Sequence, residues 1–344
     1  MSTSRPLLIR MTSAGLYCEA GGFHIDPSSP VAKAVITHAH ADHAVRGSKQ
    51  YLTAVSGRAI LAGRMGAKAA ITALEFGQPI VLNGVRVSLH PAGHILGSAQ
   101  IRVEYQGEVW VASGDYKVEP DPTCEAFEPV RCDTFITEST FAHPRFAWPE
   151  QSAAFAELET WWRSNQERGV ASFVYAYALG KAQRVLAGLN PEIGPLFCHP
   201  NVEECSLHYR RAGRPVPAMT GDAGTIDPAD WGRSLIVLPP GARFKQGFPY
   251  RGHYETSFAS GWMLLPNGPK SRRVGRGFVL SDHADRQQIL TAIAETGAER
   301  VFVMHGYIDS LVEELRQRGL DAHPLRSARC TAPPDPESDA WTMD

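Results

Sequence analysis

The stretch Thr37-His38-Ala39-His40-Ala41-Asp42-His43 places three imidazoles and one carboxylate within six positions. It follows the apolar residues 31–36, which predict a strand that ends at the cluster. Side chains at a strand end leave the sheet edge together, and divalent ions such as zinc bind imidazole nitrogen and carboxylate oxygen. The alternative is a solvated turn, but strongly hydrated groups gain nothing from being crowded there. The stretch therefore indicates a metal site.

Three later segments also place acids or a histidine at predicted strand ends. His94, close to Gly93 and Gly97, follows a strand at 85–89, and Asp115 follows a strand at 108–112. Glu138 ends a further strand in Thr137-Glu138-Ser139-Thr140. Two neighbouring metal ions need an anionic ligand between them to offset their repulsion, and Asp115 suits that role. Each residue alone could equally belong to an ordinary turn.

A βαβ pattern near the end of the chain contributes two more histidines. His283 lies just before a helix predicted at 286–296, which Asp285 would cap and Gly297 would end. The apolar strand 301–304 then leads into His305. Both histidines are thus expected at the carboxyl ends of neighbouring strands, where open α/β sheets hold their active sites.

Asp26 ends another short strand just before the metal stretch. It fits a turn-forming residue as well as it fits an acceptor that fixes the tautomer of a ligand histidine.

The middle of the chain has a different pattern. Residues 152–168 predict an amphipathic helix whose Trp161 and Trp162 face the core, and Gly169 would end it. A strand at 171–177 then leads into a helix start that carries Lys181 and Arg184, which suits either a phosphate contact or a solvated helix end. The alternation predicts a second α/β unit with its own parallel sheet.

The densest positive run follows that unit. It contains Lys270, Arg272, Arg273 and Arg276. Such a run is usually a solvated linker, but its place before the His283 motif favours contacts with a phosphate backbone.

Size and composition narrow the function classes. A chain of 344 residues suits two domains or one domain with an insertion. The formal net charge of −2 means that a polyanion would have to meet a local positive groove. The six cysteines form no Cys-x-x-Cys pair, and no stretch reaches the roughly 20 apolar residues of a membrane span. We therefore expect reduced thiols and a cytoplasmic location without a membrane partner.

Taken together, these motifs resemble the β-CASP branch of the metallo-β-lactamase superfamily over nearly the whole chain. The resemblance implies an α/β fold: a metallo-β-lactamase αββα sandwich formed by residues 1–147 and 269–332. It also implies an inserted β-CASP α/β domain at 148–268, and we expect a flexible tail at 333–344. The expected cofactors are two divalent metal ions, Zn²⁺ in the first place and Mn²⁺ as the alternative.

The resemblance also assigns roles to the residues that match the family motifs. One ion would be held by His38, His40 and His94, and the other by Asp42, His43 and His305, with Asp115 between them. Both ions would share a water, and the resulting hydroxide would attack phosphorus. His283, oriented by Glu138, would act as general acid on the leaving oxygen.

Two branches of the family remain open. His305 and residues 178–183 resemble the RNA-processing members, whereas the chain length, the compact insert and Ser260-Gly261-Trp262 are most similar to the bacterial ligase-associated DNA exonucleases. The second likeness implies a DNA exonuclease of DNA repair, with 5′ to 3′ polarity and an ATP-dependent DNA ligase and a helicase as partners. The alternatives are an RNA-processing ribonuclease, a lactamase-type or thioesterase-type hydrolase, and a non-catalytic subunit.

Overall fold

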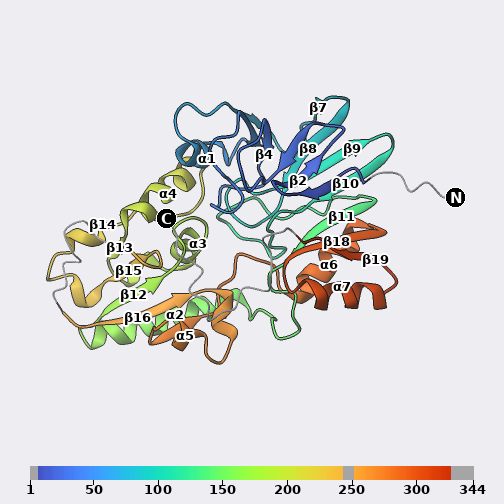
Figure 1. Cartoon of the computed structure of the whole chain (residues 1–344). Helices are drawn as coiled ribbons and strands as arrows, with labels where there is room; N and C mark the ends of the chain where they lie inside the picture. Colours follow the sequence, from blue (N-terminus) through green and yellow to red (C-terminus); the bar gives the residue numbers. More distant parts are fainter. Residues whose placement is uncertain (1–6, 243–251, 327–344) are drawn as a thin grey trace. The chain divides into compact units, whose positions relative to one another are not determined.

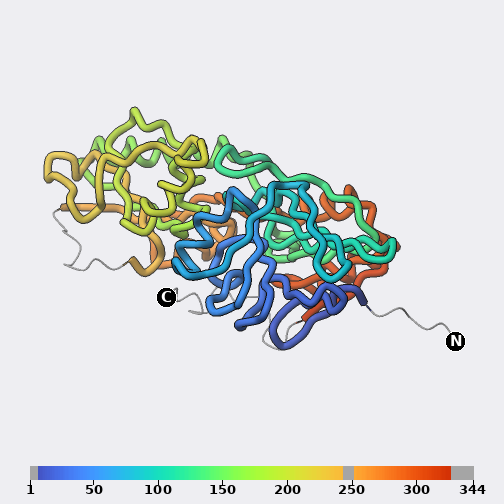
Figure 2. The backbone as a smooth tube through the Cα atoms, turned by 90° about the horizontal axis from the view of Figure 1, so that it is seen from above, coloured from blue at the N-terminus to red at the C-terminus, as the bar shows by residue number. Residues whose placement is uncertain are grey.

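The computed structural model describes residues 7–242 and 252–326. These residues form two compact units. The first contains residues 7–145 and 283–326, and the second contains residues 146–242 and 252–282. The colours in Figure 2 follow this order, because the first unit runs from blue to green and is completed by an orange to red segment. Cys330 and the expected tail at 333–344 lie outside the described residues.

Two sheets build the first unit (Figure 1). The first sheet has the strand order β1-β2-β3-β4-β5-β6, and the second has the order β19-β18-β11-β10-β9-β8-β7. The strands of the first sheet are β1 Arg10–Thr12, β2 Gly15–Cys18, β3 Phe23–Ile25, β4 Lys33–Val35, β5 Gln50–Ala54 and β6 Ile71–Leu74. Those of the second are β7 Ile80–Leu82, β8 Val85–Pro91, β9 Ala99–Tyr105, β10 Glu108–Ala112, β11 Thr134–Ser139, β18 Arg300–Gly306 and β19 Asp321–Pro324.

An apolar core fills the space between these two sheets. Phe23 and Val35 from the first sheet and Val87, Ile101 and Trp110 from the second belong to one buried cluster. Alternate residues of a strand face opposite sides, so the second sheet also has an apolar outer face. Helices α6 (Arg286–Thr296) and α7 (Ile308–Gln317) bury that face, and α1 (Arg58–Met65) packs on β6. The predicted αββα order is confirmed.

Strand direction gathers several strand ends at one edge of the second sheet. Strands β10, β11 and β18 are parallel neighbours, and β8 runs in the same direction because β9 is antiparallel to both β8 and β10. Residues that follow these four strands therefore meet at a common edge, although β18 lies far from β11 in the sequence. The orange and red segment lies against the green β11 in Figure 1.

The second unit has its own sheet, in which every strand pair is parallel, as the sequence predicts. Its order is β14-β13-β15-β12-β16-β17, with β12 Ala171–Tyr175, β13 Leu196–Cys198, β14 Gly221–Asp222, β15 Leu235–Leu238, β16 Tyr254–Ala259 and β17 Arg276–Phe278. The helices are α2 Gln151–Glu167, α3 Lys181–Gly188, α4 Pro200–Arg211 and α5 Gly268–Ser271, and short 3₁₀ turns connect several elements.

Two details of this unit bear on the sequence predictions. Trp161 and Trp162 are buried, and their indole N–H groups donate to Glu255 and to the Arg233 carbonyl, so both are core residues as expected. Residues 269–282, however, do not return to the first unit. Strand β17 pairs with β16, so the structure places the return at His283 and not at residue 269.

The local signals around α6 are reproduced in the structure. The helix spans Arg286–Thr296, the Asp285 carboxylate accepts from the Gln288 N–H, and Gly297 ends the helix in the left-handed region at φ 68°. None of the described helices has the length and apolar character that a membrane span requires.

Candidate metal centre

Loops that follow parallel strands assemble the centre within the first unit. The stretch 37–43 follows β4, His94 follows β8, and Asp115 follows β10. Glu138 and His305 lie in the last residues of β11 and β18. Carboxylates and imidazoles from distant parts of the sequence therefore meet at one place, because the sheet order fixes where each strand ends.

Three imidazoles and one carboxylate form the closest group. His38 Nε2 lies 3.0 Å from His40 Nδ1, and His94 Nε2 lies 3.1 Å from the same His40 atom. One donor atom from each of these histidines and from Asp115 lies within 4.8 Å of every other. His38 and His94 are buried, so this group is shielded from bulk water on two sides.

The Asp115 carboxylate also reaches the other half of the cluster. Its Oδ2 atom lies 3.4 Å from His43 Nε2 and 3.7 Å from His38 Nε2. The exposed carboxylate of Asp42 lies 3.7 Å from His43 Nε2. The His305 ring lies beside His43 with 6.1 Å between ring centroids, outside the tight groups that the described residues form. Asp115 thus lies between two sets of donors.

Asp26 and Thr37 set the orientation of two histidines. Asp26 Oδ2 lies 2.7 Å from His43 Nδ1 and accepts the Thr37 hydroxyl at 2.5 Å, while Oδ1 accepts the Thr37 N–H. The Thr37 hydroxyl also lies 3.0 Å from His38 Nδ1. Because its hydrogen is given to Asp26, this hydroxyl accepts from His38 Nδ1–H. Both histidines then turn Nε2 towards Asp115.

Glycine geometry permits this contact. Gly114 has φ 59°, and a Cβ there would lie 2.7 to 2.9 Å from the Thr37 side chain. Only glycine lets the turn after β10 approach Thr37 so closely while Asp115 faces the cluster. The Ser-Gly-Asp turn and the Thr-His stretch therefore depend on each other.

The electrostatics of the cluster suit cation binding. Burial, together with the neighbouring His43, His40 and His94, holds the pKa of His38 well below its usual value of 6.5. Burial alone would raise the pKa of Asp115, but the adjacent His43, together with His283 and His38, outweighs it and holds that pKa well below 3.8. The site therefore offers a neutral imidazole and an ionised carboxylate, the forms that bind metal ions.

The nitrogen contacts also fit a metal. His40 Nδ1 carries either one hydrogen or one lone pair, so it cannot complete hydrogen bonds to both His38 and His94. A cation among the three nitrogens satisfies all of them. Tetrahedral ligands at the usual zinc distance stand roughly 3.3 Å apart, close to the observed spacing. The donor set thus suits divalent ions of the zinc and manganese type.

A second pair lies next to the cluster. His283 Nδ1 contacts both Glu138 oxygens at 3.0 and 3.1 Å, and its ring lies 4.6 Å from the His94 ring. Glu138 is almost fully buried and also accepts from the Tyr116 N–H and from the Thr140 hydroxyl. The carboxylate is therefore fixed by several donors, and it fixes the imidazole of His283 in turn.

The structure corrects the prediction for Lys181 and Arg184. Both side chains are buried: the Lys181 ammonium contacts the Asp282 carboxylate at 2.5 Å and the Leu280 carbonyl at 3.0 Å, and Arg184 donates to the Ser281 carbonyl. A phosphate would have to break these buried contacts to reach either cation. Both residues instead hold residues 280–282 within the second unit.

The arginine run is only partly available to a ligand. Arg276 forms an ion pair with Glu157 at 2.6 Å, and the Arg272 guanidinium lies 5.3 Å from the centroid of the Phe258 ring. Arg273 is exposed, with a left-handed backbone at φ 54°. Of these three arginines, Arg273 remains the best candidate for a phosphate contact.

Sequence reasoning missed Thr37 and Thr140. Both hydroxyls contact carboxylates of the site, and the available signal was a hydroxyl residue directly before the first histidine and another two residues after Glu138.

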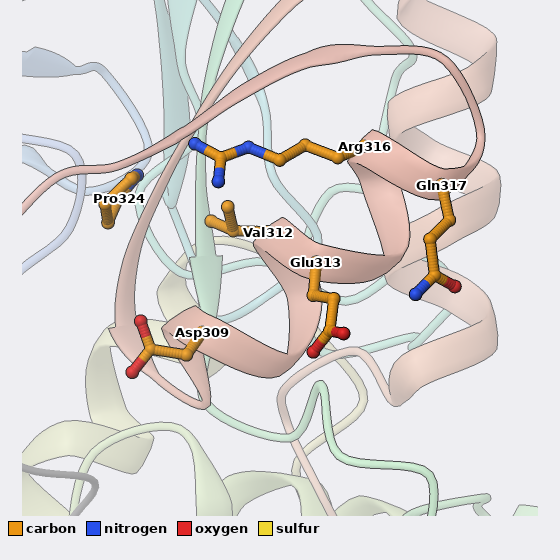
Figure 3. Close-up of a pocket in the computed structure, with 6 residues that line it drawn as sticks. All are labelled: Asp309, Val312, Glu313, Arg316, Gln317 and Pro324. Atoms are coloured by element: carbon orange, nitrogen blue, oxygen red, sulfur yellow. The ribbon is translucent and has the colours of Figure 1, made fainter.

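A pocket on the outer side of α7 lies apart from this chemistry. Figure 3 shows its lining, and none of those residues belongs to the histidine cluster. It has a volume of about 630 Å³ and is lined by Asp309, Val312, Glu313, Arg316, Gln317 and Pro324.

Comparisons with known proteins agree with the site. The chain is 29% identical over 316 residues to the "Probable DNA ligase" of Opitutus terrae, a match that covers 90% of this chain and 30% of that protein. It is 28% identical over 148 residues to the "Endoribonuclease YSH1" of Yarrowia lipolytica, which covers 41% of this chain and 17% of that protein. It is 31% identical over 115 residues to the "Transcription termination factor FttA" of Methanosarcina mazei, covering 32% of this chain and 18% of that protein.

These likenesses coincide with the convergence of the six motif residues from His38 to Asp115 on one cluster. The chain belongs to the β-CASP branch of the metallo-β-lactamase superfamily. This β-CASP protein spans less than a third of the length of those curated relatives. No family model matches it.

A solved structure supports the fold of this β-CASP protein. It is the "Crystal Structure of a Protein of Unknown Function from Enterococcus faecalis V583", with a TM-score of 0.51 and 13% sequence identity. The likeness covers 79% of this chain and 75% of that chain.

Proposed function

We propose that this protein is a metal-dependent phosphodiesterase that acts as a DNA exonuclease in DNA repair. The observation that carries the proposal is the pairing of a buried His/Asp cluster with the adjacent Glu138–His283 pair. The cluster offers donors for metal ions, and the pair offers a positioned acid for a leaving group. Hydrolysis of a phosphodiester needs both functions, whereas a simple lactam or thioester hydrolase does not need the second.

Residues on the two sides of Asp115 would hold two ions. His38, His40 and His94 supply one set of donors, and Asp42, His43 and His305 supply the other. Two divalent ions, Zn²⁺ or Mn²⁺, would lower the pKa of a shared water and offset the charge of the phosphate oxygens. Asp26 and Thr37 keep His43 and His38 in the tautomers that point Nε2 inwards.

His283 is the proposed general acid. Glu138 accepts from its Nδ1 atom, which leaves Nε2 to carry the proton that the leaving oxygen takes up. An imidazole suits proton transfer near neutral pH. The donors from Tyr116 and Thr140 keep Glu138 from turning away, so the ring keeps its direction while the proton leaves.

DNA is the favoured substrate because of the relative that matches most of this chain. The Opitutus protein is named a probable DNA ligase, and this chain covers only part of it, so one polypeptide carries that name together with a region like this chain. This supports action beside a DNA ligase, and the family resemblance adds a helicase. The second candidate is an RNA-processing ribonuclease, which the likeness to "Endoribonuclease YSH1" favours.

The test is digestion of matched DNA and RNA substrates. Oligonucleotides labelled at the 5′ or the 3′ end are incubated with the full chain and added Zn²⁺ or Mn²⁺. We expect DNA to be shortened stepwise from its 5′ end, with RNA cut far more slowly. The Asp115→Ala variant should lose both activity and bound metal.

Other results of this assay overturn specific parts of the proposal. Preferred cleavage of RNA would establish the ribonuclease instead, and internal cuts would remove the exonuclease assignment. Hydrolysis of a lactam or thioester without any nucleic-acid cleavage would remove the phosphodiesterase assignment altogether.

A further inference from the structure

Three further side chains follow the ends of β11 and β18, the strands that carry Glu138 and His305. Tyr307 follows His305 by two residues, and its N–H donates to the Ser139 carbonyl at 2.9 Å, directly after Glu138. A Cβ on Gly306 would lie 2.3 Å from that carbonyl, so the two segments are in close contact. The residues that follow β11 and β18 therefore start at the same edge of the second sheet as Glu138 and His305.

The rings of His143 and Tyr307 meet at this edge. Their centroids lie 5.1 Å apart with an interplanar angle of 57°. Tyr307 also packs against the buried cluster under α7, so its ring is held in place, whereas His143 is half-buried on a loop. Arg145 is exposed and donates from its Nε to His143 Nδ1 at 3.2 Å. We call His143, Arg145 and Tyr307 the aromatic edge.

The chemistry of the aromatic edge is that of a stacking platform. Partial burial and the nearby cations of Arg145 and Arg286 lower the pKa of His143. Its ring is therefore neutral at neutral pH, and it offers a π-face and not a charge. A neutral ring held by a second ring, with a guanidinium beside it, is the combination that binds a base and its phosphate in single strands.

We propose that the aromatic edge is a nucleotide-binding subsite. His143 stacks on a nucleobase next to the phosphodiester that is cleaved, Tyr307 supports the ring, and Arg145 contacts the adjoining phosphate. This inference rests on the proposed nuclease function and deepens it. Recognition is by stacking, so the subsite takes any base and requires that the terminal strand be unpaired.

The experiment measures binding by the full chain in EDTA, so that no cleavage interferes. The probe is a short, dye-labelled single-stranded DNA read by fluorescence anisotropy. His143→Ala should weaken binding by about 5-fold to 150-fold, the range expected for losing one base stack. His143→Phe should bind like the wild type, because it restores an aromatic face.

A matched control exists on the first sheet. His24 lies against Tyr17 with 4.5 Å between ring centroids, and Arg10 lies over that tyrosine. His24→Ala removes the same kind of ring from a similar cluster and should leave the affinity unchanged. Thermal melting of each variant shows whether the fold is kept.

A scan of single abasic positions in the oligonucleotide completes the test. Removing the base at one position should weaken binding to the wild type by the same factor as His143→Ala does. Removing that same base should not weaken binding to the His143→Ala variant any further. The inference is overturned if His143→Ala binds the oligonucleotide as tightly as the wild type, or if His143→Phe does not restore binding. It is also overturned if the abasic effects simply add to the effect of His143→Ala, or if the wild type does not bind at all.

The digestion assay separates the two proposals. If the protein cleaves DNA but His143→Ala binds DNA like the wild type, only the proposed subsite is refuted. If the protein cleaves no nucleic acid, the proposed nuclease function is refuted.

Discussion

The Thr37 hydroxyl donates to the Oδ2 atom of Asp26 over 2.5 Å, and this is the oxygen that His43 Nδ1 contacts at 2.7 Å. One carboxylate therefore fixes two imidazoles of the centre, His43 directly and His38 through the hydroxyl. Partners of this kind fix the tautomer and raise the basicity of a metal-binding histidine.

Removing that hydroxyl should weaken metal binding without unfolding the protein. Thr37→Val keeps the shape of the side chain but leaves His38 Nδ1–H without its acceptor. We expect the affinity for Zn²⁺ to fall by about 10-fold to 100-fold, as for other lost partners of metal-binding histidines. A chelator competition titration measures it. Thr160→Val, which removes an exposed hydroxyl from α2, serves as the control and should change nothing. Equal affinities for the two variants would refute the relay through Thr37.

The metal-free protein should become less stable as the pH rises above 6.5. Burial would lower the pKa of His43, but Asp115, Asp42 and Asp26 outweigh it and raise that pKa well above 6.5. The protonated form is thus favoured in the folded state. Its contribution is complete below pH 6.5 and is lost as the pH rises through the folded pKa, by at most about 1.4 kcal/mol per pH unit. The pKa of His38 is lowered in the folded state, so its contribution to stability is lost in the opposite direction, as the pH falls below 6.5.

Thermal melting in EDTA at a series of pH values above 6.5 measures this effect. Saturating Zn²⁺ should reverse the slope, because the ion takes the place of the proton on His43 and binds more tightly as protons are removed. His43→Gln should abolish the fall in the metal-free protein. A melting temperature that rises with pH in EDTA would contradict the assignment.

His283 and Glu138 should affect turnover and not metal content. His283→Ala removes the proposed acid, and we expect kcat to fall by about 10²-fold to 10⁴-fold with both ions retained. Glu138→Gln keeps a hydrogen-bonding partner but removes its charge, so a smaller loss and a shifted alkaline limb of the pH profile are expected. Metal analysis accompanies both assays. Loss of metal from the His283 variant would make that residue a ligand instead.

Charge reversal at Arg273 should weaken substrate binding in a salt-dependent way. Arg273 is exposed, whereas Arg276 is paired with Glu157. Arg273→Glu should raise KM and reduce the slope of log KM against log salt by about 0.7 to 0.9 for one lost phosphate contact. Arg211→Glu, an exposed arginine that ends α4 in the same unit, is the control. An unchanged slope would show that Arg273 does not contact phosphate and is an ordinary solvated turn residue.

The strand ends of the centre were predictable because their signals are local. The stretch 37–43, the glycines around His94 and the turn before Asp115 each show in the sequence that a polar group follows an apolar strand. Strand order then brings them together, and the resemblance of the motifs supplied that order. The α6 boundaries were predictable for the same reason, since Asp285 and Gly297 are next to the helix that they delimit.

The predictions that were wrong depend on contacts between residues that are distant in the sequence. Lys181 and Arg184 have the composition of a phosphate site, but their partners lie about a hundred positions further along, at Asp282 and Ser281. Nothing near residue 181 in the sequence shows that pairing. Residues 269–282 were misplaced in the same way, because only the pairing of β17 with β16 assigns them to the second unit.

The interruption of the first unit affects how the protein is made. His38 to Asp115 leave the ribosome before the second unit, and His283 and His305 leave after it. At 5 to 20 residues per second, the nascent chain carries an incomplete histidine cluster for roughly 10 to 40 s. A chain released early therefore has no Glu138–His283 pair. The proposed hydrolysis would require that translation has passed β18.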